Sequence, residues 1–291
     1  MELLLVLALA GVAAAAVTLS RNRHRSTTGA SPVARVAMPT TPTLGPRGME
    51  TTFPEGPAAR DAYILDAVKR GEADIRWAIV RSEYQGHVGE FRVFADALKI
   101  QGVRVNLTPA GQQRVADALG CMLLTLKLAD LIWASRQVTL PPFGMSQTAH
   151  DLEIMGTVQR MIDHSRKIDA ALVSLGQPPE GIVSTVGKHW VIDDALLFHP
   201  GMAENYGWHN SQKFGPVCAT AAGGAGCHVI QDPGWRHNLG HLDYSQTCVL
   251  VDMQCTVDGA PNQLPAVLQH PMLSFLASHK GPMKVLRQPG V

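Results

Sequence analysis

The residues best suited to chemistry lie within 235–251, which reads WRHNLGHLDYSQTCVLV. Imidazole, carboxylate, phenol and hydroxyl groups are gathered there, and these groups can bind a metal ion or move protons. The stretch ends in an apolar run typical of a buried strand, which we expect at 244–251. The residues before such a strand lie where rigid scaffolds present functional groups. The candidate catalytic residues here are His237, Asp243, Tyr244 and Ser245, with His241 between them.

A second short stretch, NYGWH at 205–209, places another histidine at the end of an expected strand. His209 is therefore the third candidate catalytic group beside His237 and Asp243. Aromatic side chains with an apolar face and a polar tip accompany these histidines, and we expect them to contact a substrate. They are Tyr206, Trp208 and Trp235.

A zinc site is the first chemistry that these residue types permit. Zinc in proteins binds imidazole nitrogen and carboxylate oxygen, so His209, His237 and Asp243 would supply three ligands. His241 would be the remaining ligand or a proton carrier. The metallopeptidase patterns HExxH and HxH are absent. His237 and Asp243 are also one residue closer than in the lysostaphin and D-Ala-D-Ala peptidase pattern.

Two chemistries without a metal compete with it. In one, Ser245 or Tyr244 is activated by a histidine that Asp243 orients. In the other, Cys227 is a nucleophile that follows the Gly-rich run 223–226. Thiol hydrolases place that cysteine at a helix N-terminus, where its pKa is lowered. The residues after Cys227 instead read as a strand, so this route fits least well.

The cysteine pattern supports neither a zinc ribbon nor a redox motif. The chain has five cysteines, none of them in a CxxC pair, and the odd number leaves at least one thiol free. Small buried side chains are the common role of such cysteines, and one disulfide, such as Cys218–Cys227, remains compatible with the spacing.

The elements that must position these groups form two halves. The half at 58–176 is rich in helical spacing, and the half at 180–291 consists mainly of short strand patterns. Thr108 and Pro109 mark one helix start and Gly120 its end, while Asp258-Gly259 marks a turn. Together they predict an α+β fold, with helices packed on a mainly antiparallel β-sheet, in one globular domain at 58–291. Helices are expected at 58–71, 108–120, 125–136, 148–175 and 264–276, and strands at 74–84, within 87–98, and at 102–107, 187–192, 204–209, 226–231, 244–251 and 253–257.

The N-terminal residues predict a membrane anchor. Residues 2–19 form a continuous apolar run, and a Pro/Thr/Gly-rich linker follows, so we assign 1–20 to an anchor or signal segment and 21–57 to the linker. The basic residues follow the apolar run instead of preceding it, which favours an uncleaved anchor with a cytoplasmic body. Secretion is the alternative, because the alanines at 13–16 offer a cleavage site.

Composition narrows the class of partner. The net charge is +1 and aromatic residues are 5% of the chain, which argues against a basic surface or stacking platforms for nucleic acid. The apolar fraction of 46% is ordinary for a chain that buries a core. The expected partners are the membrane and a cell-envelope polymer or protein.

The motifs together resemble a family of bacterial proteins of no assigned activity. Tyr206-Gly207-Trp208-His209, then His237-x5-Asp243-Tyr244-Ser245, carry the resemblance, together with 104–133 and the turn at 257–259. It covers about residues 90–280 and implies one integrated domain with a site at these motifs. Family members often carry DYSHG where this chain has DYSQT, so Gln246 stands where many of them have a histidine.

Two functions fit these observations. The first is a membrane-anchored hydrolase that cleaves an amide, ester or glycan bond, with a cell-envelope substrate. Such a substrate requires export, which conflicts with the cytoplasmic side that the charge pattern favours. The second is a non-catalytic binding or structural module that is tethered to a membrane.

Overall fold

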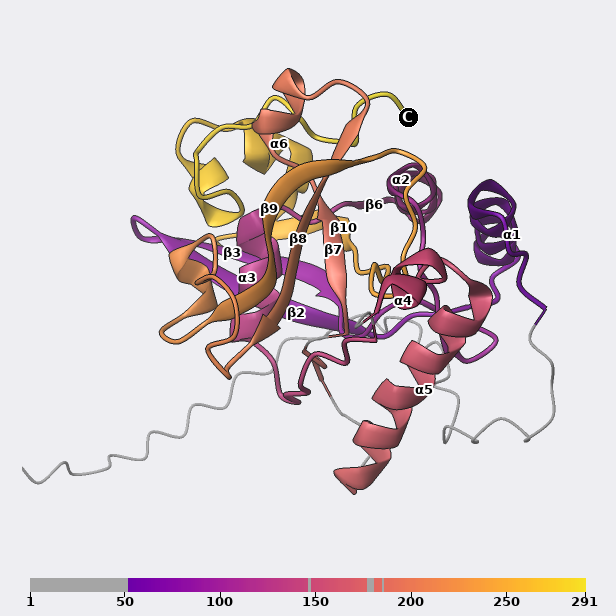
Figure 1. The fold of residues 1–291 in the computed structure, drawn as a ribbon. Helices are drawn as coiled ribbons and strands as arrows, with labels where there is room; N and C mark the ends of the chain where they lie inside the picture. The colour runs from indigo at the N-terminus through magenta and orange to yellow at the C-terminus, as the bar shows by residue number, and fades with distance from the viewer. Residues whose placement is uncertain (1–51, 146–147, 177–180, 185) are drawn as a thin grey trace, which may run out of the picture. The chain divides into compact units, whose positions relative to one another are not determined.

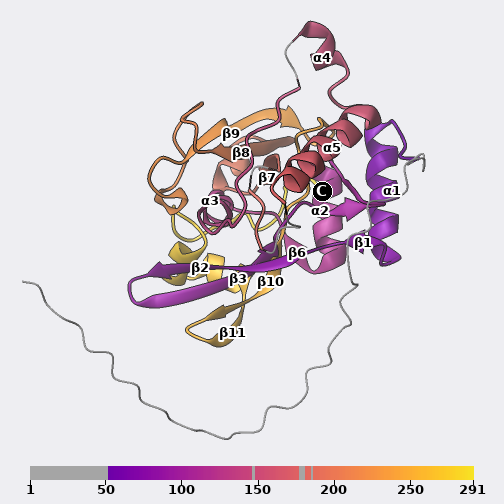
Figure 2. The ribbon, with the colours of Figure 1, turned by 90° about the horizontal axis from the view of Figure 1, so that it is seen from below.

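Two antiparallel sheets with a helix between them form the centre of the protein (Figure 1, Figure 2). A computed structural model describes residues 52–145, 148–176, 181–184 and 186–291. The membrane segment expected at 1–20 and most of the linker expected at 21–57 lie outside the described residues. Among the helices of the described ranges, none is long and apolar enough to span a membrane.

The larger sheet has five strands and draws them from both predicted halves of the chain. Its main path runs β11-β10-β3-β2, and β6 pairs with β10. The turn at Asp258-Gly259 is confirmed, because both residues have a positive φ, as a two-residue hairpin turn of type I′ requires. The strands are β2 (Trp77–Tyr84), β3 (His87–Phe94), β6 (Cys121–Met122), β10 (Val251–Val257) and β11 (Ala260–Gln263).

The second sheet has three strands in the order β7-β8-β9. They are β7 (Lys188–Val191), β8 (Met202–Asn210) and β9 (His228–Asn238). All residues of β8 after Met202 are buried, so both faces of this strand are covered. A small third sheet joins β1 (Ala73–Asp74), β4 (Lys99–Ile100) and β5 (Val103–Arg104).

Threonine side chains begin most of the α-helices. Thr108, Thr125, Thr148 and Thr157 each accept a hydrogen bond from a backbone N–H of the first helical turn. Gly120 ends its helix in the left-handed conformation, as the sequence predicted. The helices are α1 (Pro57–Lys69), α2 (Pro109–Leu119), α3 (Leu126–Ala134), α4 (Ala149–Glu153), α5 (Val158–Ser174) and α6 (Leu264–Gln269), with short 3₁₀ turns η1 (Asp194–Phe198), η2 (Ala221–Gly223) and η3 (Leu273–Leu276).

Helix α3 lies between the two sheets and contacts both β2 and β8 (Figure 2). Its residues are almost all buried, which explains the apolar composition LKLADLIWA. Asp130 is the one acidic residue in this sequence and is fully buried. The prediction of an α+β fold with helices packed on antiparallel sheets is confirmed.

The helix expected at 264–276 is shorter, because α6 ends at Gln269 and η3 begins at Leu273. Two other expected elements are wrong at one shared place. The single helix predicted at 148–175 is interrupted between α4 and α5, and the strand predicted at 244–251 begins only at Val251. Residues 242–244 instead pack against the helix break, where the Tyr244 N–H donates to the Met155 carbonyl oxygen at 2.8 Å. A Cβ at Gly156 would lie 2.8 Å from the Leu242 carbonyl oxygen, so glycine permits this contact.

Gly156→Ala tests whether the helix break holds this segment. The added methyl group must push Leu242 away, so we expect the free energy of unfolding to fall by about 1–3 kcal/mol, the usual cost of overpacking. Urea denaturation measures it. Gly144→Ala is the matched control, because a Cβ there meets no atom within 4 Å. Equal denaturation midpoints for the two variants would show that this contact is not tight.

Candidate functional site

The two faces of the β7–β8–β9 sheet carry two separate polar clusters. Residues opposite each other in an antiparallel ladder point to the same face, and the ladder pairs Trp190 with Asn205 and His189 with Tyr206. Neighbouring residues point to opposite faces. Trp190 and Asn205 therefore lie on one face, and His189 and Tyr206 lie on the other.

Asp243 is the centre of the first cluster, which we call the Asp243 cluster (Lys188, His237, His241, Asp243 and Ser245). Its buried carboxylate accepts from Lys188 Nζ at 2.8 Å and from Ser245 Oγ at 2.5 Å. His241 Nε2 lies 3.9 Å from Oδ2. Burial alone would raise the pKa of Asp243, but the His241 imidazole, the Lys188 ammonium and the Ser245 hydroxyl together hold that pKa well below its usual range.

His237 and His241 stack face to face at the partly exposed side of this cluster. Their ring centroids lie 3.8 Å apart, and both rings pack edge-on against Trp190. Burial, and then the His241 ring and the Lys188 charge, lower the pKa of His237 to about 4. The His237 ring is therefore neutral at neutral pH. His237 was expected in a loop, but β9 extends through it, and its pairing with Ala203 turns the ring toward Trp190.

Ser245 meets Asp243 through a turn and not through a strand. The sequence suggested that the two side chains share a strand face, but both the Ser245 N–H and the Ser245 hydroxyl donate to Asp243 Oδ1 across two residues. This is the local hydrogen bonding typical of an aspartate-led turn. The Ser245 hydroxyl is thus bound to a carboxylate, and its role here is to fix one oxygen of Asp243.

Tyr244 and Trp208 lie in a small apolar cluster with Met145. The Tyr244 hydroxyl accepts from the Met145 N–H at 2.7 Å, and both aromatic rings lie within 6 Å of the buried His164 ring. Burial lowers the pKa of His164 to about 4. These contacts assign packing to Tyr244 and Trp208, which the sequence had placed among the catalytic and substrate-binding groups.

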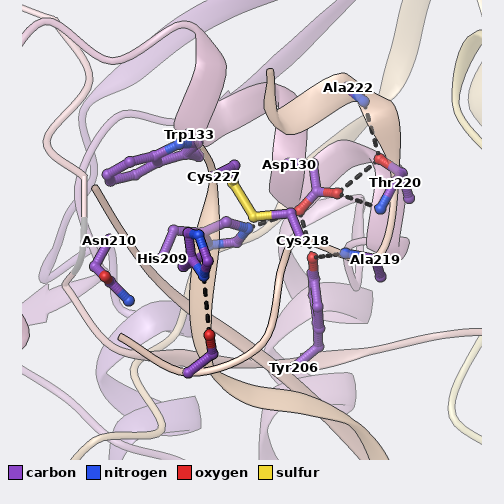
Figure 3. Close-up of a disulfide and its surroundings, with 12 residues drawn as sticks. Asp130, Trp133, Tyr206, His209, Asn210, Cys218, Ala219, Thr220, Ala222 and Cys227 are labelled. Carbon is purple, nitrogen blue, oxygen red and sulfur yellow. Dashed lines mark hydrogen bonds and ion pairs between the residues drawn. A yellow bond between two sulfur atoms is a disulfide. The ribbon is translucent and has the colours of Figure 1, made fainter. Parts of the chain in front are cut away.

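The second cluster lies on the other face and surrounds Asp130 of α3 (Figure 3). Tyr206 Oη donates to Asp130 Oδ1 at 2.6 Å, and His209 Nε2 lies 2.7 Å from the same oxygen. The Thr220 N–H and hydroxyl both donate to Oδ2, at 2.9 and 2.6 Å. We call these residues the Asp130 cluster. A lone carboxylate in an apolar helix was the sequence signal for it, and sequence reasoning missed that signal.

A disulfide between Cys218 and Cys227 lies beside the Asp130 cluster. It uses the Cys227 sulfur, so the cysteine-nucleophile chemistry is not available to the oxidised protein. Asp130, His209, Cys218 and Cys227 each offer one ligand atom, and these atoms all lie within 4.8 Å of one another. This group of side chains can hold a metal ion, although it is not the set that the sequence suggested.

His209 is separated from the other three residues of the predicted zinc site. In the ladder, His209 pairs with Val229 whereas Ala203 pairs with His237. The two positions are six residues apart along β8, which is about 20 Å at the rise of an extended strand. One zinc ion at ordinary ligand distances does not bridge that gap. The prediction that His209, His237, His241 and Asp243 together bind one zinc ion is therefore wrong.

A cavity of about 20 Å³ borders the Asp130 cluster, which is enough for one water molecule. His189, His209 and Ser184 are among the residues that line it. Burial, and next the charge of His209, lower the pKa of His189 to about 3. A neutral imidazole and a hydroxyl thus face the same enclosed space.

Trp235 stacks on His199 near a buried glutamate. The two rings lie 4.4 Å apart and almost parallel. Both carboxylate oxygens of Glu204 are buried and have no hydrogen-bond partner among the described residues. Burial, and then the charge of Asp193, raise the pKa of Glu204 to about 8. Glu204 is therefore mainly protonated at neutral pH. Trp235, predicted to bind substrate, belongs to this separate group.

Comparison of the chain with protein-family models, with curated proteins and with solved structures finds no match. The side chains themselves are therefore the basis for a function. Of the two polar clusters, the Asp243 cluster offers partly exposed ionisable groups, because the side chains of His241 and Lys188 are 26% and 13% exposed. In the Asp130 cluster, Asp130 and His209 are at most 4% exposed.

Glu204→Gln tests the protonation of the buried carboxyl. Because the pKa of Glu204 is raised in the folded protein, Glu204 loses its proton at lower pH in the unfolded chain. The stability that Glu204 contributes is therefore fully present below about pH 4.5 and is lost as pH rises to about 8. The variant lacks this loss. We expect its stability relative to wild type to rise with pH, by at most about 1.4 kcal/mol per pH unit.

Urea denaturation at a series of pH values measures this difference. Glu153→Gln is the control, because that carboxyl is on the surface, with its side chain 76% exposed. Parallel stability curves for Glu204→Gln and wild type between pH 5 and 8 would mean that Glu204 is ionised in the folded protein.

Proposed function

We propose that this protein is a hydrolase and that the Asp243 cluster is its active site. The observation that carries the proposal is the juxtaposition of a buried carboxylate, a lysine ammonium bound to it and a partly exposed pair of histidines. A carboxylate beside an imidazole, with a cation close by, is the arrangement that activates water and stabilises a developing negative charge. The scissile bond is of the amide, ester or glycan class.

His241 is assigned the role of general base. Its Nε2 is buried and faces Asp243 at 3.9 Å, so the other ring nitrogen, Nδ1, is assigned the proton from water. A proton taken from water by His241 creates an imidazolium, which the Asp243 carboxylate stabilises. The neutral His237 ring stacks on His241 and restricts its orientation. Ser245 holds Asp243 in place from the other side.

Lys188 is assigned to substrate binding, and the neighbouring Asn205 is fully buried. An ammonium has three N–H donors, and one of those on Lys188 is directed to Asp243. Both polar atoms of the Asn205 amide are buried without a partner among the described residues. Asn205 lies on the same sheet face as Trp190, against which His237 and His241 pack. A carbonyl oxygen or a sugar hydroxyl of the substrate would accept a hydrogen bond from a remaining Lys188 donor, whereas Asn205 lies out of the substrate's reach.

The apolar segment at 1–20 is proposed to anchor the hydrolase to the membrane, and the linker at 21–57 to give it reach. A cell-envelope polymer is the substrate that suits this setting if the folded part is exported. A reporter fused after Val291 determines the side of the membrane. A cytoplasmic reporter would remove the envelope substrate from the proposal and leave a substrate at the inner membrane face.

His241→Gln is the direct test of the proposed base. The ring makes no hydrogen bond to the described residues, so we expect the variant to fold and kcat/KM to fall by about 10²–10⁴-fold. Full-length protein is assayed on nitrophenyl esters, on peptide amides and on purified peptidoglycan. His150→Gln is the matched control, because His150 is on the surface with its side chain 75% exposed.

Asp243→Asn is a second, independent test of the same site. It leaves Lys188 beside an uncharged amide, so circular dichroism must accompany the assay to show that the variant is folded. Equal rates for wild type and both variants, or no turnover of any probe by wild type, contradict the hydrolase. Stable binding to peptidoglycan without turnover would then favour the non-catalytic module.

A further inference from the structure

We propose that Asp130, His209, Cys218 and Cys227 form a zinc site that becomes available when the disulfide is reduced. The site lies on the face of β8 opposite the Asp243 cluster, so it does not depend on the proposed hydrolase. In the oxidised protein the two sulfurs bind each other. In the reduced protein they would bind the metal. The redox state of the two cysteines would thus control whether zinc can bind.

The four ligand atoms already lie close to the separations that zinc requires. All of them are within 4.8 Å of one another. Tetrahedral zinc with Zn–S near 2.3 Å and Zn–N or Zn–O near 2.0 Å places its ligand atoms about 3.3–3.8 Å apart. The most distant pair must therefore approach by about 1 Å, and the two sulfurs must separate. Side-chain rotation supplies movements of this size.

The backbone that carries the cysteines is held by more than the disulfide. The Cys218 N–H donates to the Cys227 carbonyl oxygen at 3.1 Å, and Val217 forms a β-bridge with His228. These bonds remain when the sulfur–sulfur bond is broken. The Cα atoms of the two cysteines, 5.5 Å apart, would thus stay close in the reduced protein. A preformed pair of thiols lowers the entropy cost of binding a metal.

The donor set and its surroundings suit zinc. Two thiolates, an imidazole and a carboxylate are all common zinc ligands. Hydrogen bonds from Tyr206 and Thr220 already orient the Asp130 carboxylate, as outer partners orient ligands in metal sites (Figure 3). The His209 ring stacks on Trp133 at 5.8 Å, which limits its rotation. The ligands are therefore positioned before the ion arrives.

A dithiol can serve as the reductant that opens the Cys218–Cys227 disulfide. Two thiol–disulfide exchange steps transfer the disulfide bond to the reductant and leave Cys218 and Cys227 as thiols. Zinc then displaces the two thiol protons. The half-buried Cys218 is the exposed end of the pair, where reductant and metal enter.

Cobalt binding to the full-length protein tests the proposal. Co²⁺ replaces zinc in tetrahedral sites, and thiolate ligands give it a charge-transfer absorption in the near ultraviolet. We expect the protein reduced with a phosphine to bind about one equivalent with this absorption, and the oxidised protein to show none. X-ray absorption of the reduced zinc protein should give sulfur and nitrogen or oxygen shells of equal size.

Substitutions identify the ligands. We expect His209→Gln and Asp130→Asn to weaken cobalt binding by at least ~10-fold. Cys218→Ser should lower the charge-transfer absorption, and the double variant Cys218→Ser/Cys227→Ser should remove it. Cys121→Ser and Cys248→Ser are the matched controls, because both thiols are buried away from the site and free in the oxidised protein. Neither should change binding.

The proposal is overturned if reduced wild-type protein binds no cobalt or binds it without thiolate absorption. It is also overturned if binding survives both His209→Gln and Cys218→Ser unchanged. The wild-type measurement needs no variant, so a variant that fails to fold does not obscure the result. A negative result would not contradict the proposed hydrolase. The Asp243 variants are assayed by substrate turnover, whereas the zinc-site variants are assayed by metal binding.

Discussion

The constraint on which the structure depends is the burial of a polar strand, β8, which is covered on both of its faces. Strand β8 is buried along nearly its whole length, yet it carries Glu204, Asn205, Tyr206 and His209. A buried polar group without a partner is costly, and among the described residues the neighbouring layers match some of these side chains but not Glu204 and Asn205. Asp130 of α3 does this for Tyr206 and His209. The position of α3 between the sheets therefore follows as much from polar matching as from its apolar face.

The buried carboxylates differ in how completely they are matched. Asp130 accepts hydrogen bonds on both oxygens, and Asp243 is bound by a lysine and a serine. Glu204 has no hydrogen-bond partner among the described residues, and its pKa is raised to about 8. A neutral carboxyl escapes most of the desolvation penalty that an ion would carry. The fold thus accommodates Glu204 by keeping it protonated, and it accommodates Asp130 and Asp243 by hydrogen-bonding and ion-pairing them.

Sequence patterns within a few residues predicted much of the fold, whereas contacts between residues far apart in the sequence determine the candidate sites. Thr108, Gly120 and Asp258-Gly259 act within a few residues, so the cap, the helix end and the turn were readable from the sequence. The partnership of Asp130 with His209 spans 79 residues, which no local pattern encodes. The positive φ values at Gly207 and Trp208 also return His209 to the face of Tyr206, where simple alternation would place it on the other face.

The same irregularity explains why the histidines that gather in the sequence divide in space. Lys188 and His189 are consecutive, yet one binds Asp243 and the other lines the cavity near Asp130. A regular strand separates neighbours in this way, while the distortion at Trp208 brings Tyr206 and His209 onto one carboxylate. The two clusters lie on opposite faces of one sheet and share no side chain. Substitutions on the two faces should therefore act nearly independently, as they do at sites without shared partners.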